Sequence, residues 1–503
     1  MMVRLAAGLA LALVLGLAGP AAASELRIAL NEDPDLLDPA QGGSFVGRDV
    51  FAAMCDKLVD IAPDMSFVPQ LATGWDWSAD RKSLTLHIRD GVVFHDGTRL
   101  DAAAVKVNLD RYRTAPESRR KGEVKPIADV VVVDPLTVRL DLSAPYAPLL
   151  AVLADRAGMI MSPTALAALG DKIATKPVCA GPYRFVERVP QERIVLERFD
   201  KYWNPAPYTI DRVTYTPVPD ATVRLAGLRS GGFDIVDRLA ASDAGAVQGD
   251  PALQFVEVTG LGYNLLSINL NNGPAADNPL GKDKRVREAF ELSIDRKILN
   301  DVVFEGRFVP SNQFEAPGSR YWDAAHPVPA RDVAAAKRLL AAAGVPHPAF
   351  TLTTGTGSVE LQVAQTLQAM ASEAGFEVKL QAVEAATMVQ KNSTGDYQAA
   401  FVIWSGRPDP DGNIAIWIAC DGFLNWGRYC NAELDRDLAA ARATTDPAER
   451  AKLYADAADI YLADRPTLVL YHFKWLWGIS RKLAGFVPHP DGLIRLAGLK
   501  IAP

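Results

Sequence analysis

The sequence predicts an α/β protein that is divided into two or three lobes. Its 503 residues exceed what one hydrophobic core usually supports. Strand and helix patterns are mixed along the whole chain, and from Lys284 to Trp404 they alternate. This alternation favours β-α-β units in that part of the chain. With 49% hydrophobic and 22% charged residues, the composition is ordinary for a globular protein.

The first half predicts mainly strands. In Ser83 to Arg89, Leu84, Leu86 and Ile88 share one face, and Asp90-Gly91 closes the strand. Asp101 can then cap a helix that runs through Leu109. The other elements expected here are a strand over Leu26 to Leu30, a helix over Val46 to Leu58, a hairpin over Val130 to Leu142 that turns at Asp134-Pro135, and a hairpin over Tyr183 to Phe199 that turns near Pro190-Gln191.

The second half predicts helices and strands in turn. Gly344 and Gly375 can each end a helix. The expected elements are helices over Lys284 to Val302, Arg331 to Ala343 and Ser358 to Ala374, a strand over Phe376 to Gln381, a further helix, a strand over Ala399 to Trp404, a loop rich in Pro, Asp and Gly, a mostly helical stretch over Glu433 to Ala463, and a strand over Leu468 to Ile479.

The N-terminus predicts export. Arg4 precedes an apolar run from Leu5 to Leu17, and small residues follow up to Ala23, so we expect cleavage between Ala23 and Ser24. The apolar run is too short for a comfortable membrane span. We therefore expect a mature protein in the periplasm. The chain carries a net charge of −7 and no basic stripe, which argues against nucleic acid as a partner.

Four cysteines in an oxidising compartment favour disulfides. Cys55, Cys179, Cys420 and Cys430 allow three pairings, and four free buried thiols are the alternative. No C-x-x-C or C-x-x-H spacing indicates zinc. We expect no metal and no cofactor.

Catalytic motifs are missing from the sequence. We find no H-E-x-x-H, G-x-S-x-G or G-x-x-x-x-G-K-[ST] pattern, and the six histidines do not cluster along the chain. Many carboxylates are present, so the rival hypothesis is an exported hydrolase that acts on peptides or glycans through paired acids. A receptor would bind its ligand stoichiometrically and leave it intact.

Several segments together resemble a known family. They are Ala29-Leu30-Asn31 with Leu37-Asp38-Pro39, the block from Leu71 to Leu109, Cys55 to Val59, Gly181-Pro182-Tyr183, Arg285 to Phe290 with Ile294-Asp295-Arg296, and Ala334 to Gly344. Together they resemble the solute-binding proteins of peptide-type ABC importers, a family that includes dipeptide, oligopeptide, opine and nickel binders. The resemblance covers nearly the whole mature chain.

The resemblance implies a two-lobed periplasmic-binding-protein fold of type II with an extra subdomain in the first lobe. After a signal peptide at 1–23, lobe I would comprise 24–45, 180–265 and 475–503, the extra subdomain 46–179, and lobe II 266–474. A hinge would lie where the chain crosses between lobes. Related proteins often carry a disulfide near Cys420 and Cys430, which would leave Cys55 to pair with Cys179.

The resemblance also implies a ligand site after the strand that ends at Trp404. Peptide binders have a tryptophan, two small residues and an aspartate there, and the aspartate pairs with the peptide ammonium. Here Trp404, Ser405 and Gly406 match, but Arg407 takes the place of the acid. An arginine attracts carboxylate or phosphate instead. The arginine that dipeptide binders carry for the peptide carboxylate is also missing from Ser358 to Ala364.

Two alternatives concern the acids of the following loop, which runs from Asp409 to Asn413. Asp409 or Asp411 could replace the missing acid if the loop is shifted, or either could pair with Arg407 as a solvated loop charge. Phe401 to Cys430 contains no histidine, which disfavours nickel as the ligand.

Further ligand contacts are predicted near the first helix and the hinge. The amides of Gly43 and Ser44, next to Phe45, could bind an anion at the start of a helix. Tyr263 and Asn264 stand at the expected hinge, and Trp417 and Trp426 could stack on a ligand. For each aromatic residue alone, burial in the core is the alternative.

Taken together, the sequence predicts a monomeric periplasmic receptor without catalytic activity. It would bind a peptide, an opine or another acidic or amide-rich solute, and its closed form would dock on an inner-membrane ABC permease.

Overall fold

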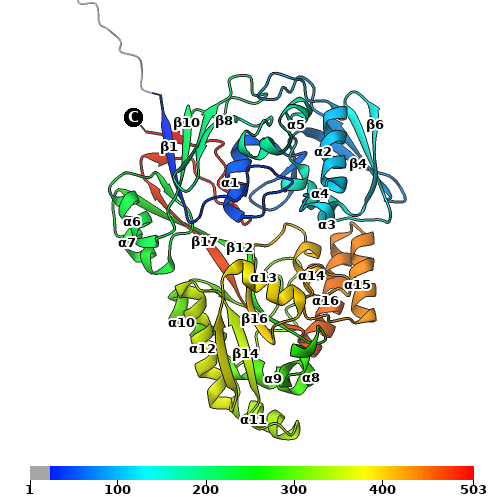
Figure 1. Ribbon diagram of the computed structural model, residues 1–503, viewed down its shortest axis with the longest axis vertical. Helices are drawn as coiled ribbons and strands as arrows, with labels where there is room; N and C mark the ends of the chain where they lie inside the picture. The colour runs from blue at the N-terminus through cyan, green and yellow to red at the C-terminus, as the bar shows by residue number, and fades with distance from the viewer. Residues whose placement is uncertain (1–22, 503) are drawn as a thin grey trace, which may run out of the picture.

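The structure is a computed structural model that describes residues 23–502 (Figure 1). It is a mixed α/β molecule with two lobes, as predicted, and strands β12 and β17 run between them. The expected signal segment lies outside the described residues except for Ala23. No helix in the described part of the chain combines the length and apolar composition needed to cross a bilayer.

One large sheet continues through both lobes. Its order is β15 (Glu377–Ala382), β14 (Ala349–Thr354), β16 (Ala399–Trp404), β12 (Leu253–Ile268), β17 (Thr467–Ser480), β11 (Ile235–Val236), β1 (Glu25–Leu30), β10 (Arg212–Pro217), β9 (Arg193–Arg198) and β8 (Tyr183–Val189), with β13 (Val309–Pro310) beside β17. β12 and β17 are antiparallel and pair from Leu253–Ser480 to Ser267–Thr467. These two strands therefore connect the lobes.

Lobe I has its own hydrophobic core, in which Ile28, Phe51 and Trp477 are fully buried. We propose that this lobe comprises residues 23–57, 158–259 and 474–502. Besides its part of the large sheet it contains α1 (Phe45–Met54), α5 (Pro163–Leu169), α6 (Ala221–Arg229), α7 (Ala244–Gln248), β18 (Leu483–Ala484) and β19 (Lys500–Ile501).

A separate core supports the extra subdomain, which we place at residues 58–157. It holds β2 (Val59–Ile61), β3 (Phe67–Pro69), the sheet β4 (Ala72–Trp77), β5 (Ser83–Ile88), β7 (Thr137–Leu142) and β6 (Ile127–Asp134), and the helices α2 (Ala102–Thr114), α3 (Lys121–Val124) and α4 (Leu149–Leu153). Leu84 and Leu86 are fully buried, and the Asp101 carboxylate caps α2 by accepting from the Ala104 amide.

The packing differs from the predicted subdomain limits of 46 and 179. Val50 and Phe51 of α1, and Met161 and Cys179 further on, belong to the core of lobe I. Their side chains pack with the central sheet, so these segments stay with that lobe. Helix α1 also ends at Met54, four residues before the predicted Leu58.

Lobe II, which we place at residues 263–472, contains the predicted β-α-β arrangement. β14 is parallel to both β15 and β16. Its helices are α8 (Pro279–Lys282), α9 (Lys284–Ser293), α10 (Arg296–Phe304), α11 (Val333–Ala342), α12 (Ser358–Ala374), α13 (Ala385–Thr394), α14 (Asp411–Ile418), α15 (Ala432–Ala443) and α16 (Pro447–Asp464).

Two predictions for this lobe were wrong in detail. The helix expected from Lys284 to Val302 is interrupted at Ile294, which is extended, and Asp295 caps a new helix by accepting from the Ile298 amide. The loop expected after Trp404 is shorter than predicted, because α14 starts at Asp411.

The pairing of β12 with β17 is irregular at two places, one of them between Asn264 and Leu265. The register also shifts between Thr259 and Tyr263, opposite Phe473. A Cβ atom at Gly262 would lie 2.3 Å from the Phe473 ring and 2.3 Å from the Trp404 carbonyl oxygen. We propose that Gly260 to Gly262 and Phe473 form the hinge between the lobes.

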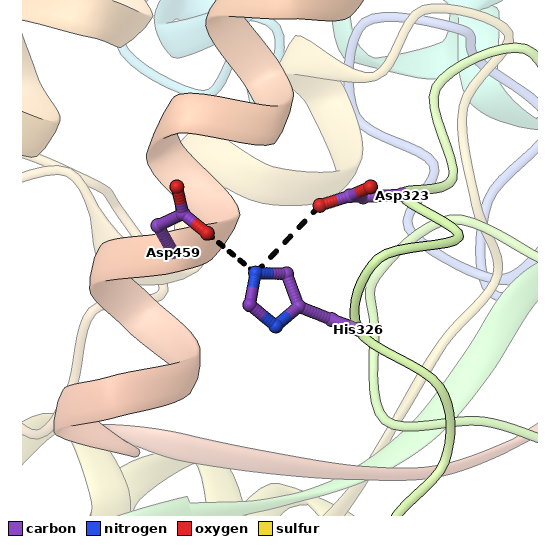
Figure 2. Close-up of side chains that lie close together, drawn as sticks. All are labelled: Asp323, His326 and Asp459. Atoms are coloured by element: carbon purple, nitrogen blue, oxygen red, sulfur yellow. Dashed lines mark hydrogen bonds and ion pairs between the residues drawn. The ribbon is translucent and has the colours of Figure 1, made fainter.

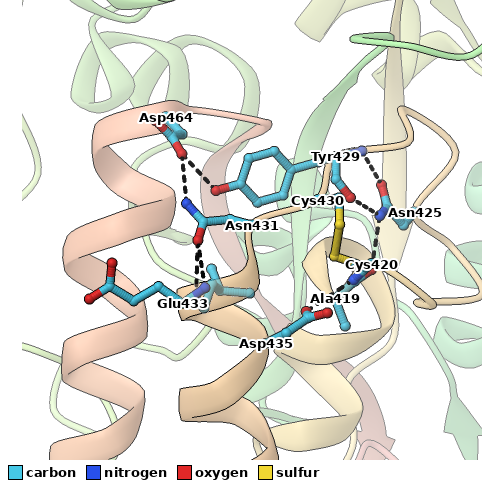
Figure 3. Close-up of a disulfide and its surroundings, with 10 residues drawn as sticks. Ala419, Cys420, Asn425, Tyr429, Cys430, Asn431, Glu433, Asp435 and Asp464 are labelled. Atoms are coloured by element: carbon cyan, nitrogen blue, oxygen red, sulfur yellow. Dashed lines mark hydrogen bonds between the residues drawn. A yellow bond between two sulfur atoms is a disulfide. The ribbon is translucent and has the colours of Figure 1, made fainter.

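Both predicted disulfides are present, Cys55–Cys179 and Cys420–Cys430, and the alternative of four free thiols is wrong. Figure 3 shows the second bridge between the end of α14 and the start of α15. Asp435 accepts from the Cys420 amide at 3.1 Å, and Asn425 donates to the Ala419 and Tyr429 carbonyl oxygens at 2.9 and 2.6 Å. The disulfide and these hydrogen bonds therefore fix the conformation of the segment between α14 and α15.

Candidate functional site

The segment from Trp404 to Asn413, which we call the ligand loop, follows the end of β16. The Asn413 side chain organises it. Its Oδ1 accepts from Trp404 Nε1 at 3.1 Å and from the Arg407 amide at 2.7 Å, and its Nδ2 donates to Glu315 at 2.9 Å and to the Arg407 carbonyl at 3.0 Å. Two of these bonds hold the Arg407 backbone, and the other two fix the Asn413 side chain against Trp404 and Glu315.

Gly406 brings the ligand loop close to the hinge. Its φ of +82° lies in the left-handed region that favours glycine, and a Cβ atom there would lie 2.4 Å from the Leu261 carbonyl carbon. Any larger residue would push the loop away from β12. The loop and the proposed hinge are therefore in direct contact.

Arg407 spans the boundary between the lobes. Its Nη1 donates to the Gly406 carbonyl at 2.8 Å and to Ser405 Oγ at 3.4 Å, and its guanidinium carbon lies 4.4 Å from the centre of a Trp404 ring. Its Nε is 3.7 Å from the Oδ2 atom of Asp155 in the subdomain. Burial lowers the pKa of Arg407, and the Asp155 charge opposes that shift.

On the lobe I side, Asp155 is enclosed by cations. Its Oδ1 accepts from Arg48 Nε at 3.0 Å and from the Arg156 amide at 2.7 Å. Although burial opposes ionisation, Arg48, Arg156 and Arg407 hold the pKa of Asp155 far below its usual range. Asp155 is therefore ionised at neutral pH.

Two more guanidinium groups converge beside this aspartate. Arg156 Nη1 and Arg120 Nη2 both donate to the Gly42 carbonyl, at 2.9 and 3.3 Å, and Arg120 also pairs with Glu123 at 2.6 Å. We call Arg48, Arg120, Arg156 and Arg407 the arginine cluster. Among the described residues, the acids that form ion pairs with this cluster are Asp155 and Glu123, fewer than the four guanidinium groups. This arrangement can bind a multiply acidic ligand group.

The sequence did not reveal the three arginines from the first lobe and its subdomain. They lie far apart along the chain, match no motif, and meet because α1, the segment before α3 and the turn after α4 come together. Only the Arg407 member was predicted.

The loop acids do not replace the missing peptide anchor. Both Asp409 oxygens accept from Arg450 at 2.7 Å, and Asp411 accepts from Arg442 at 2.6 Å. Asp411 also accepts from Tyr146 Oη of the subdomain at 3.3 Å. Asp409 is therefore a structural residue, and the hypothesis that either acid pairs with Arg407 was wrong.

The predicted anion site at the first helix is occupied by the chain itself. The Gly43 and Ser44 amides donate to Asp35, at 2.7 and 3.2 Å, and Ser44 Oγ caps α1. Phe45 is partly exposed and stacks on Trp475 with ring centres 4.6 Å apart. Because Asp35 accepts from both amides, these two predicted donors are already used within the chain.

Of the remaining predicted residues, Tyr263, Asn264 and Trp417 are buried, and Trp426 is partly buried. Tyr263 is fully buried and donates to the Asn413 carbonyl, and Asn264 is 5% exposed. Trp417 is 3% exposed and lies edge-on to Trp404 and Trp426. For Tyr263 and Trp417 the structural alternative fits better than ligand contact.

A second polar cluster lies in lobe II, away from the ligand loop. Figure 2 shows His326 between Asp323 and Asp459, with Nε2 3.7 Å from Asp323 and in closer contact with Asp459. Asp459 is on α16 and its side chain is 67% exposed. The contact between His326 and Asp459 joins the loop that carries His326 to helix α16.

Comparison with known proteins gives a consistent result. Residues 66–425 match the model for bacterial extracellular solute-binding proteins, family 5 middle. The chain is 32% identical over 490 residues to the glutathione-binding protein GsiB of Pectobacterium atrosepticum, covering 94% of this chain and 93% of that protein.

Solved structures agree on the fold. The periplasmic binding protein AgaA of A. tumefaciens R10 in complex with agropinic acid superposes with a TM-score of 0.84 at 27% identity, covering 95% of this chain and 99% of that one. A dipeptide binding protein from Pseudoalteromonas sp. SM9913 in complex with Met-Leu gives a TM-score of 0.84 at 22% identity, covering 95% and 100%.

Proposed function

This chain belongs to family 5 of the bacterial extracellular solute-binding proteins, which capture a ligand for an ABC importer, and we propose that its own ligand is an acidic small solute. The relatives named above are binding proteins, and the exported hydrolase considered from the sequence has no counterpart among them. The proposed receptor leaves its ligand chemically unchanged.

The observation that carries this proposal is Arg407 at the lobe boundary. Where peptide-binding relatives are expected to hold an ammonium with an acid, this chain has a partly buried guanidinium beside three other arginines. The start of α12, where dipeptide binders carry an arginine, is exposed and has Glu360 in its first turn. Free dipeptides therefore lack both of their usual charge partners.

The named ligands of two relatives fit this chemistry. Glutathione, named for the GsiB relative, carries two carboxylates, and agropinic acid, bound to AgaA, is also an acid. We propose glutathione-like γ-glutamyl compounds and opine acids as the first ligands to examine. A guanidinium can hold a carboxylate through two parallel hydrogen bonds.

The experiment is native mass spectrometry of protein purified from the periplasm without refolding, followed by identification of the released ligand. We expect a bound acid in the wild type and its loss in Arg407→Ala. Arg338→Ala removes an exposed arginine from α11 and should retain the ligand. Titration calorimetry with glutathione, an opine acid and a neutral dipeptide then gives affinities.

An ordinary free peptide that is retained equally by wild type and Arg407→Ala would refute the acidic-ligand proposal. A released ligand that is chemically converted on incubation with the protein would refute the receptor proposal.

We further propose that the mature receptor is a periplasmic monomer that starts at Ser24. The Ser24 nitrogen donates to Asp211 at 3.0 Å, so cleavage before Ser24 would place a new ammonium beside a carboxylate. Intact-mass measurement of the exported protein and light scattering test the start and the monomeric state.

A further inference from the structure

We propose that Arg48, Arg120 and Arg156 form a second anion subsite, so that the ligand carries two acidic groups, one held by Arg407 and one by these three arginines. This inference rests on the proposed function of the same site and specifies the ligand class.

The three arginines are almost fully buried, although each has a guanidinium nitrogen without a hydrogen-bond partner among the described residues. They are 3%, 4% and 5% exposed, respectively. Arg48 Nη1, Arg120 Nε and Arg156 Nε are enclosed and have no hydrogen-bond partner among the described residues. A buried guanidinium atom without a partner is costly, and an acidic ligand group at this site would supply the missing acceptor.

Charge balance also indicates an anion. The cluster holds four guanidinium groups, and among the described residues the Asp155 and Glu123 carboxylates form ion pairs with them. Asp49 and Asp491 also interact with Arg48 electrostatically, but from beyond ion-pair distance, and Asp491 is paired with Arg495. Burial and the neighbouring Arg120 lower the pKa of Arg156 to about 9. One ligand carboxylate would leave one of these cations uncompensated, whereas two carboxylates would neutralise the cluster.

The geometry separates the two subsites. Arg120 and Arg156 are fixed by the Gly42 carbonyl, which both of them bind. Arg407 is fixed on the other lobe by the Gly406 carbonyl. Asp155 stands between them, 3.7 Å from Arg407 and 3.0 Å from Arg48. A ligand with acids at both ends would contact both lobes and stabilise the closed form.

The test uses the full mature protein and the ligand released from it. We expect a released compound with at least two acidic groups. Blocking either acid as its methyl ester should weaken binding at least tenfold. Arg156→Gln and Arg120→Gln should each weaken the diacid about tenfold or more, and Arg156→Lys should recover part of the affinity. Arg338→Gln serves as the matched control.

The monoesters show which acid the subsite holds. One of the two monoesters lacks the acid that the second subsite would hold. For this ester, Arg156→Gln should lower the binding affinity by less than twofold relative to the wild type, while Arg407→Gln should still lower it strongly. A monoacid ligand, or unchanged diacid affinity in both Arg156→Gln and Arg120→Gln, would overturn the second subsite. In those cases an acidic ligand that is lost in the Arg407 variant would still support the proposed function. Failure of the second subsite can therefore be told apart from failure of the proposed function.

If no ligand co-purifies, inorganic phosphate is the probe. We expect saturable millimolar binding by calorimetry at constant ionic strength, weakened at least threefold in Arg156→Gln but not in Arg338→Gln. Absence of phosphate binding, or equal binding by wild type and Arg156→Gln, would overturn the subsite. Circular dichroism of each variant identifies any that fail to fold, and Arg156→Lys then replaces Arg156→Gln.

Discussion

At the scale of single residues, Asn413 shows how much of the site depends on one side chain. It bonds Trp404, Glu315 and both backbone groups of Arg407. Nothing in the local sequence distinguishes this asparagine from a loop residue, because its partners come from β16 and from a separate segment. The resemblance located the Trp404 to Arg407 segment, but the bonds that shape it depend on the folded chain.

Buried histidine makes stability depend on pH. His472, fully buried on β17, lies 3.1 Å from the Gln313 carbonyl oxygen, and burial lowers its pKa to about 4. The unfolded chain, with a histidine pKa of about 6.5, binds more protons between pH 4 and 6.5. The free energy of unfolding therefore falls as the pH drops through this window, by about 2 kcal/mol at pH 5 for this residue.

We expect His472→Gln, which keeps a donor for Gln313, to remove that part of the pH dependence. Urea unfolding at pH 7.5 and pH 5 measures it, with exposed His347→Gln as control. If wild type and His472→Gln lose the same stability between the two pH values, the histidine does not titrate as described.

At the scale of elements, local signals predicted most helices and strands. α12 and β16 have the predicted limits, and Asp101 caps α2. The errors arose where a break depends on tertiary contacts. Ile294 is buried in the lobe II core, and its extended backbone ends α9, although apolar periodicity continues through it. Periodicity alone cannot detect such a break.

Gly262 of β12 lies in a crowded part of the proposed hinge. Gly262→Ala places a methyl group 2.3 Å from the Trp404 carbonyl oxygen, so β12 or the ligand loop must move. We expect a loss of about 1–3 kcal/mol in the free energy of unfolding, together with weaker ligand binding. Gly122→Ala, where no atom outside its own helix lies within 4 Å of the added Cβ, should lower neither quantity. Denaturant titration measures the free energy of unfolding, and calorimetry measures ligand affinity. Equal values of both quantities in the two variants would contradict a steric clash at Gly262.

At the scale of the whole molecule, the structure brings the lobes into contact. Besides Arg407 and Asp155, the Ala147 amide donates to the Arg442 carbonyl at 2.8 Å, and Lys125 lies 3.8 Å from Asp421. In Figure 1, helices α14 to α16 lie directly below the subdomain. The two-lobed fold was predictable from the resemblance, but these contacts join residues hundreds of positions apart and no local pattern indicates them.

Tyr146 offers a way to weaken closure without changing the arginine cluster. Its hydroxyl donates to Asp411, which is the first residue of α14 and lies within the ligand loop. Because this bond joins the two lobes, Tyr146→Phe should destabilise the closed form more than the fold of either lobe. A loss of about 1 kcal/mol corresponds to roughly fivefold weaker apparent ligand affinity when closure and binding are coupled.

Small-angle scattering should show a larger radius of gyration for Tyr146→Phe without ligand, and a return to the wild-type value at saturating ligand. Tyr397→Phe is the matched control, since its hydroxyl lies 3.3 Å from Ser267 within lobe II and its loss should lower stability without changing the closed fraction. Equal scattering and equal affinity in wild type and Tyr146→Phe would mean that the lobes close without this bond, leaving the ligand and the Arg407 contact as the source of closure.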